Sequence, residues 1–366
     1  MVIKNAKDFF INKIIFPNVL ITDRPGVIIS KTLGIFGNRK RRMIYDFEDI
    51  FASLQRETLA ELGNGRASDL FYKIGKDVGT QYSFFFSKQK IPTLFLQSFI
   101  NYTFSRLASV GMSFAKFISF DPKNISLVLE GEENIICRQT GNASMFAGLV
   151  SGVLSSLCGE NIEAEAKCID CSKKCRIEAN RDISVKYLPS LKEIAPLKNY
   201  DSLNFPSKIN LPSKLPALND FYNFKKIIHK DTKFYFKGRV LFFSEANMPG
   251  IVAKNYEDNK KLFENATIKS AESLALDLFR ETGKTKNKLN YLQGLLSAFG
   301  WGVPYYYKRE SNQVIFKFLY SPINRYGSLY QALELNGFLN AIFNKKFRIK
   351  SLETKYNPVV TEITYS

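Results

Sequence analysis

The sequence predicts an α+β fold: short antiparallel sheets with helices packed over them, built twice along one chain of 366 residues. Apolar residues recur at helical spacing in some segments and alternate in others, which distinguishes helices from half-buried strands. Several of these segments recur in the same order in the second half of the chain. An apolar content of 45% is typical of a folded protein, and the length suffices for two domains with cores of their own.

The elements of the first copy follow from these periods. A helix is predicted over residues 66–83, where apolar side chains recur at every fourth position (Leu70, Ile74 and Val78). Two strands of a hairpin are predicted at 114–120 and 125–130. A helix rich in small residues is predicted around 147–157.

This last helix lies in the stretch Gln139–Gly159, which carries no charge and has the length of a membrane span. The stretch contains four serines, however, and Gly148 and Gly152 have the spacing at which helices approach closely. We therefore expect a buried helix in close contact with a neighbouring helix, and no membrane span.

The second copy repeats the order of the first. A helix is predicted over 268–280 and strands at 303–310 and 314–320. The offset between copies is steady, because Gly300 follows Gly111 by 189 residues and Gly337 follows Gly152 by 185 (both counted from the sequence). A steady offset over several elements indicates tandem copies of one domain.

The domain organisation follows from this repeat. We predict a domain at 1–183, a proline-rich linker at 184–232 and a degenerate second copy at 233–366. Within the linker we expect a helix only around 218–228. The two copies are expected to pack as an intramolecular pseudo-dimer, and a homodimer is the alternative.

The basic run 39–42 is read as a solvated turn between strands or as a phosphate contact.

All five cysteines fall within the 39 positions from Cys137 to Cys175. The spacing of Cys168, Cys171 and Cys175 favours a zinc site, since zinc binds thiolates and completes a tetrahedron with a carboxylate or imidazole. The only histidine is distant in sequence, so Glu165 and Cys137 are the candidates for the remaining ligand. The alternative is a set of buried, reduced cysteines that act as small apolar side chains.

The same stretch resembles the 4-vinyl reductase domain family, which includes the sensor domains of phenol-responsive activators and is related to TRAPP subunits. The resemblance covers roughly residues 40–180. It is carried by three short motifs: Cys-Arg-Gln-Thr-Gly at 137–141, Glu-Ala-Lys-Cys at 165–168 and Cys-Arg-Ile at 175–177. It implies a structural zinc held by Cys137, Glu165, Cys168 and Cys175, next to a pocket for an apolar small molecule. By this resemblance Cys171 is an alternative ligand or a redox thiol. The second copy has no cysteine and therefore cannot hold the same zinc.

The net charge of +18 is uneven, because residues 181–366 hold 29 Lys and Arg against 16 Asp and Glu (both counted from the sequence). Such an excess favours contact with polyanions or reflects a solvated surface. Two clusters of cations are the candidate polyanion contacts. We name them the first basic cluster (Lys284, Lys286 and Lys288) and the second basic cluster (Lys345, Lys346, Arg348 and Lys350).

These observations favour a non-enzymatic, zinc-binding regulatory or ligand-sensing protein, with a role in transcription regulation as one reading. The alternative is a basic protein that binds nucleic acid or the transcription machinery through its second half. A chain with one histidine offers little for His-dependent catalysis, and it contains no glycine-rich phosphate-binding loop. The clustered thiols and an N-terminus without a secretory signal predict a reducing, cytoplasmic location.

Overall fold

The computed structural model describes most of the chain. The described residues are 20–31, 40–87, 95–98, 100–101, 103–104, 112–170, 174–189, 215–230, 233–310, 313–322, 325–355 and 360–366. They confirm the α+β class, because helices alternate with three antiparallel sheets. The chain forms two compact units, which are described separately below. Unit 1 comprises Met1–Ile50, Leu197–Lys254 and Asn259–Ser366, and unit 2 comprises Phe51–Pro196 and Asn255–Asp258.

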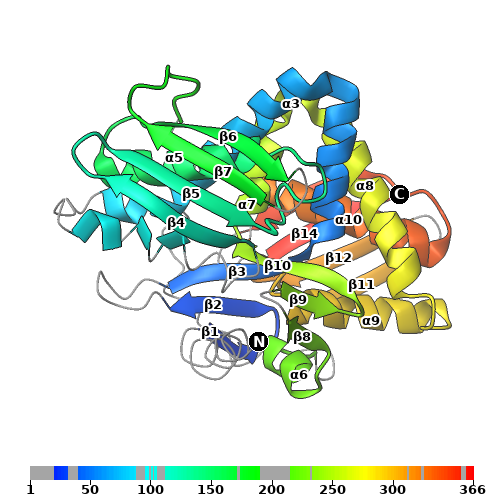
Figure 1. Cartoon of the computed structure of the whole chain (residues 1–366). Helices are drawn as coiled ribbons and strands as arrows, with labels where there is room; N and C mark the ends of the chain where they lie inside the picture. The colour runs from blue at the N-terminus through cyan, green and yellow to red at the C-terminus, as the bar shows by residue number, and fades with distance from the viewer. Residues whose placement is uncertain are drawn as a thin grey trace. The chain divides into compact units, whose positions relative to one another are not determined.

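Unit 1 contains a six-stranded sheet that joins the two halves of the chain (Figure 1). Its strands in spatial order are β1 (Leu20–Arg24), β2 (Val27–Lys31), β3 (Lys40–Phe47), β10 (Arg239–Glu245), β9 (Lys233–Phe236) and β8 (Ile227–Lys230). β3 and β10 pair in antiparallel register, with Phe47 opposite Leu241. Each half therefore contributes three strands to the sheet, and two strands from each half flank this central pair.

The second sheet of unit 1 has the strand order β11 (Val303–Glu310), β12 (Gln313–Leu319), β14 (Val360–Tyr365) and β13 (Ile349–Lys355). Helix α10 (Arg325–Phe343) connects β12 to β13. It packs closely on α8 (Lys260–Leu278), where a Cβ added at Gly337 would lie 2.4 Å from the carbonyl oxygen of Ile268. The other helices of unit 1 are α6 (Leu218–Asn223), α7 (Met248–Asn255) and α9 (Thr285–Ala298).

Unit 2 contains the sheet β4 (Phe114–Asp121), β5 (Ser126–Glu132), β7 (Lys174–Asn180) and β6 (Glu163–Asp170), in that spatial order. Helix α5 (Ser144–Cys158) connects β5 to β6 and lies against the sheet (Figure 1). This is the same strand order and the same helix position as in the second sheet of unit 1. The predicted domain boundaries themselves stay predictions.

The long helix α3 (Glu48–Ser87), kinked at Gly63, packs on α5 through glycines on both helices. A Cβ added at Gly75 would lie 2.0 Å from the carbonyl oxygen of Met145, and one added at Gly152 would lie 2.2 Å from that of Lys76. The two backbones are thus in direct contact. The expected close helix pair is confirmed, and no helix in the described part of the chain is long and apolar enough to cross a membrane.

Two local predictions are wrong. The helix expected at 218–228 ends at Asn223, because Lys225 has a left-handed φ of 51° and the chain then turns into β8. The basic run is not a turn over its described residues, which belong to β3. Arg42 within it is buried and donates hydrogen bonds to the carbonyl oxygens of Gly300 and Tyr320, both at 3.1 Å.

Candidate functional site

The first candidate site is a group of three thiols in unit 2, which we call the thiol cluster (Cys137, Cys168 and Cys175). Cys137 lies in a turn after β5 that Asn134 organises. The carbonyl oxygen of Asn134 accepts hydrogen bonds from the backbone N–H of Cys137 (3.1 Å) and of Arg138 (2.8 Å). Gln55 on α3 fixes the same turn by donating a hydrogen bond to the carbonyl oxygen of Ile136 at 2.7 Å. The Cys137 thiol is therefore buried at a defined position.

The other two thiols come from the β6–β7 hairpin. Cys168 and Cys175 are directly opposite each other in the antiparallel register, so their side chains lie on the same face of the sheet. Cys175 is buried, and a Cβ added at Gly131 on the adjacent strand would lie 3.2 Å from its Sγ. Cys168 is exposed and donates a hydrogen bond to the carbonyl oxygen of Gly141 at 2.9 Å. Two segments distant in sequence thus bring three thiols to one corner of unit 2.

The buried thiols influence each other's pKa. The neighbouring Cys175 thiol, burial and the Cys168 sulfur together raise the pKa of Cys137 well above its usual value. The neighbouring Cys137 thiol lowers the pKa of Cys175, against the opposing effect of burial. Cys175 is therefore the sulfur of the pair that more readily carries a negative charge.

Of the remaining predicted ligands, Glu165 is not part of this group. Glu165 stands three positions before Cys168 in a regular stretch of strand, so it projects from the opposite face of the sheet. Its carboxylate is exposed and lies 3.4 Å from the Lys186 ammonium. Cys171 falls outside the described residues. Among the residues that are described, no group of three or more His, Cys, Asp or Glu side chains is arranged to hold a metal ion.

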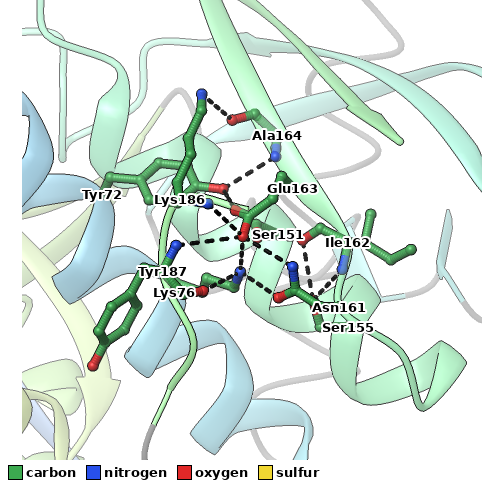
Figure 2. Close-up of polar contacts among 10 residues, drawn as sticks. All are labelled: Tyr72, Lys76, Ser151, Ser155, Asn161, Ile162, Glu163, Ala164, Lys186 and Tyr187. Carbon is green, nitrogen blue, oxygen red and sulfur yellow. Dashed lines mark hydrogen bonds and ion pairs between the residues drawn. The ribbon is translucent and has the colours of Figure 1, made fainter. Parts of the chain in front are cut away.

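The second candidate site is a buried ion pair between Lys76 on α3 and Glu163 on β6, with Nζ and Oε1 2.6 Å apart (Figure 2). Both side chains are 0% exposed. The ammonium also donates hydrogen bonds to Asn161 Oδ1 (2.8 Å) and to the carbonyl oxygen of Tyr187 (2.6 Å), so all three of its protons have acceptors. Tyr72 donates a hydrogen bond to the other carboxylate oxygen of Glu163.

This network ties the chain after β7 to the interior of unit 2. Glu163 Oε1 accepts a hydrogen bond from the backbone N–H of Lys186 at 3.1 Å, and Lys76 binds the next carbonyl, that of Tyr187 (Figure 2). Burial alone would raise the pKa of Glu163, but hydrogen bonds from Lys76, Tyr72 and Asn161 outweigh it and hold that pKa below its usual range. Burial lowers the pKa of Lys76, and the pair with Glu163 offsets this only in part. The arrangement is a saturated structural anchor, without an open position for a substrate.

Sequence reasoning missed this anchor because isolated Lys and Glu residues are usually exposed. The available signal was weak. Lys76 stands between Gly75 and Gly79, the glycines that bring α3 onto α5, so a side chain there has little access to solvent. Nothing in the spacing pairs Lys76 with Glu163, 87 positions away.

The basic clusters lie in unit 1. The first basic cluster spans the start of α9, where Lys284 and Lys286 are exposed. In the second, which runs from the end of α10 into β13, Lys346 forms an ion pair with Glu272 at 2.6 Å and Lys345 lies over the Phe347 ring. Within the described part of the chain, the cations of the first basic cluster have no carboxylate partner.

Comparisons with known proteins give little further information. No family model matches the chain, and no curated protein matches it. One solved structure that it resembles is the phenol-responsive sensory domain of the transcription activator PoxR, determined with phenol. The TM-score is 0.35 at 16% sequence identity, over 45% of this chain and 89% of that one. This neighbour is distant, and the resemblance to the 4-vinyl reductase family stays a prediction.

Proposed function

We propose that this protein is a non-enzymatic regulatory protein whose unit 2 is a zinc-stabilised, ligand-responsive module. The observation that carries the proposal is the convergence of Cys137, Cys168 and Cys175, from a turn and a hairpin that are distant in sequence, at one corner of the unit. Thiolates are the ligands that zinc prefers in closed structural sites. A closed thiolate site supports stability and shape, whereas a hydrolytic zinc keeps a position for water.

The thiol cluster fits zinc in the type of its donors and partly in their position. Cys137 and Cys175 are already neighbours, and Cys168 would exchange its hydrogen bond to Gly141 for the metal. Because Glu165 projects from the other face of β6, its role as the fourth ligand requires a local change in the strand. Cys171, three residues after Cys168, is the alternative fourth ligand that the sequence provides.

Cobalt substitution tests the metal part of the proposal. The full chain is loaded with Co²⁺, and the thiolate-to-cobalt charge-transfer absorption is titrated for the wild type and for Ser variants of each cysteine. We expect Cys137→Ser, Cys168→Ser and Cys175→Ser each to weaken the band, and Cys158→Ser to leave it unchanged. Comparing Glu165→Gln with Cys171→Ser then identifies the fourth ligand. A band that survives all three cluster variants would contradict the proposed site.

The ligand-responsive part is tested separately. A panel of apolar small molecules, phenols included, is screened for an increase in the unfolding temperature of the zinc-loaded chain, since a ligand that binds only the folded state stabilises it. A regulatory module should bind at least one such compound and release it chemically unchanged. Conversion of a bound compound into product would overturn the non-enzymatic reading.

A second candidate function is contact with nucleic acid or with the transcription machinery. It is favoured by the first basic cluster, in which Lys284 and Lys286 are exposed and no cation has a carboxylate partner in the described part of unit 1. Exposed lysines bind phosphates with little sequence preference, and such binding is strongly salt-dependent.

A further inference from the structure

The strand register of the β6–β7 hairpin has a consequence beyond metal binding. Cys168 and Cys175 are direct cross-strand neighbours. The Cα atoms of such antiparallel pairs are about 4.5 or 5.5 Å apart, depending on the type of pair. Both separations fall within the range of about 4.4–6.8 Å that a disulfide bond requires.

The two thiols differ in their access to solvent. Cys168 is exposed, whereas Cys175 is 3% exposed and Cys137 is 8% exposed. A soluble oxidant therefore reaches the cluster through Cys168, and Cys175 stands directly across the hairpin from it. Cys158, the remaining described cysteine, is half-buried on α5, and burial followed by the charge of Glu160 raises its pKa to about 11. A thiol of that kind reacts slowly with oxidants.

We propose that Cys168 and Cys175 form a reversible disulfide when a hydroperoxide reaches the thiol cluster, and that this bond blocks metal binding. The Cys168 sulfur attacks the peroxide oxygen, giving a sulfenic acid and one molecule of water. The Cys175 sulfur then displaces the hydroxyl group as a second water. Two thiols lose two electrons and two protons, and one hydrogen peroxide is reduced to two waters. A dithiol reductant reverses the step by thiol–disulfide exchange.

Oxidation would remove two of the three cluster thiols as ligands. This regulatory consequence rests on the proposed zinc site, but formation of the disulfide does not, since it requires only the register and the exposure of Cys168. Bound zinc should in turn slow the oxidation, because it occupies both sulfurs.

The test uses the full chain, reduced and stripped of metal with a chelator, and treated with hydrogen peroxide. Intact mass should fall by the mass of two hydrogen atoms, and non-reducing peptide mapping should link Cys168 to Cys175. Cys168→Ser should abolish the link, whereas Cys171→Ser and Cys158→Ser should retain it. A link from Cys137 or Cys171 to another cysteine, or oxidation of Cys168 without any link, would overturn the proposal.

A parallel arm separates this inference from the proposed function. Zinc is added back to reduced protein, its content is measured, and the peroxide reaction is repeated. We expect zinc to slow formation of the link at least tenfold, and oxidised protein to take up no zinc. If no zinc binds but the Cys168–Cys175 link forms, the proposed metal site fails and the disulfide stands. If zinc binds and the link never forms in metal-free protein, the disulfide fails and the metal site stands.

Discussion

Replacing Gly152 on α5 with alanine should destabilise unit 2 strongly. The added Cβ would lie 2.2 Å from the carbonyl oxygen of Lys76 and 2.6 Å from the backbone nitrogen of Thr80. Both atoms are backbone, so no side chain can rotate away. Restoring an ordinary contact of about 3.4 Å requires α3 and α5 to separate by about 1.2 Å. A gap of that size loses about a quarter to a half or more of the dispersion energy between the two helices.

The expected change in the free energy of unfolding follows from two opposing effects. Overpacking costs about 1–3 kcal/mol or more, and an unyielding backbone contact lies at the upper end of that range. The higher helix propensity of alanine returns up to about 1 kcal/mol. We expect a net loss of about 2–3 kcal/mol, which lowers the unfolding temperature of a domain of this size by about 4–12 °C.

A matched control exists in the partner helix. Gly65 on α3 is exposed, and a Cβ added there has no heavy atom within 4 Å. Gly65→Ala should therefore raise the unfolding temperature, because it gains helix propensity without a clash. Thermal unfolding of the wild type and both variants, followed by circular dichroism, gives the comparison. A Gly152→Ala variant as stable as Gly65→Ala would refute the close helix contact.

Three further predictions concern buried and exposed charges. Glu163→Gln should lower the free energy of unfolding by about 3–5 kcal/mol, because it leaves the Lys76 ammonium buried without its counter-ion. The double variant Lys76→Met/Glu163→Leu should lose less stability than the single variant, because it leaves no buried charge. A double variant that is less stable than Glu163→Gln would contradict this reasoning. Burial raises the pKa of Asp46 to about 7 and that of Glu334 well above its usual value. Both carboxyl groups ionise near pH 4 in the unfolded chain, so the folded state holds more protons above that pH. The stability of the fold should therefore fall as pH rises from about 5 to 8. Glu334→Gln should reduce this fall, measured as the change in urea midpoint between those pH values, and an unaltered change would count against the buried acidic pair. Charge reversal of the first basic cluster should lower the affinity for DNA or RNA and flatten its salt dependence by roughly one unit of slope per lost contact. If the variant and the wild type bind with the same affinity and the same salt dependence, the second candidate function is removed.

The fold could be predicted where local patterns determine it. Helical spacing at Leu70, Ile74 and Val78 located α3, and the small residues around Gly148 and Gly152 predicted a close helix contact that the structure contains. These features depend on neighbours within one or two helical turns, and a sequence shows them directly.

Long-range features could not be predicted in the same way. The pairing of β3 with β10 joins segments about 200 residues apart, and no local pattern specifies which strands pair. The apolar residues Ile227 and Ile228 fit a helix or a strand, and the left-handed turn at Lys225 decides between them. Glu165 was predicted as a ligand because the only histidine is distant and because the family resemblance implies it, whereas strand alternation places it on the opposite face from Cys168.

The most direct test of the account is the zinc content of the full chain, purified under reducing conditions without chelator, beside that of the Cys175→Ser variant. Cys175 faces Cys168 across the hairpin and neighbours Cys137, so we expect its loss to abolish zinc binding by the thiol cluster. We predict one zinc per wild-type chain and none in Cys175→Ser, with a steep loss of stability because metal binding contributes to folding. Metal-free wild-type protein of full stability, or zinc retained in Cys175→Ser, would contradict the central claim.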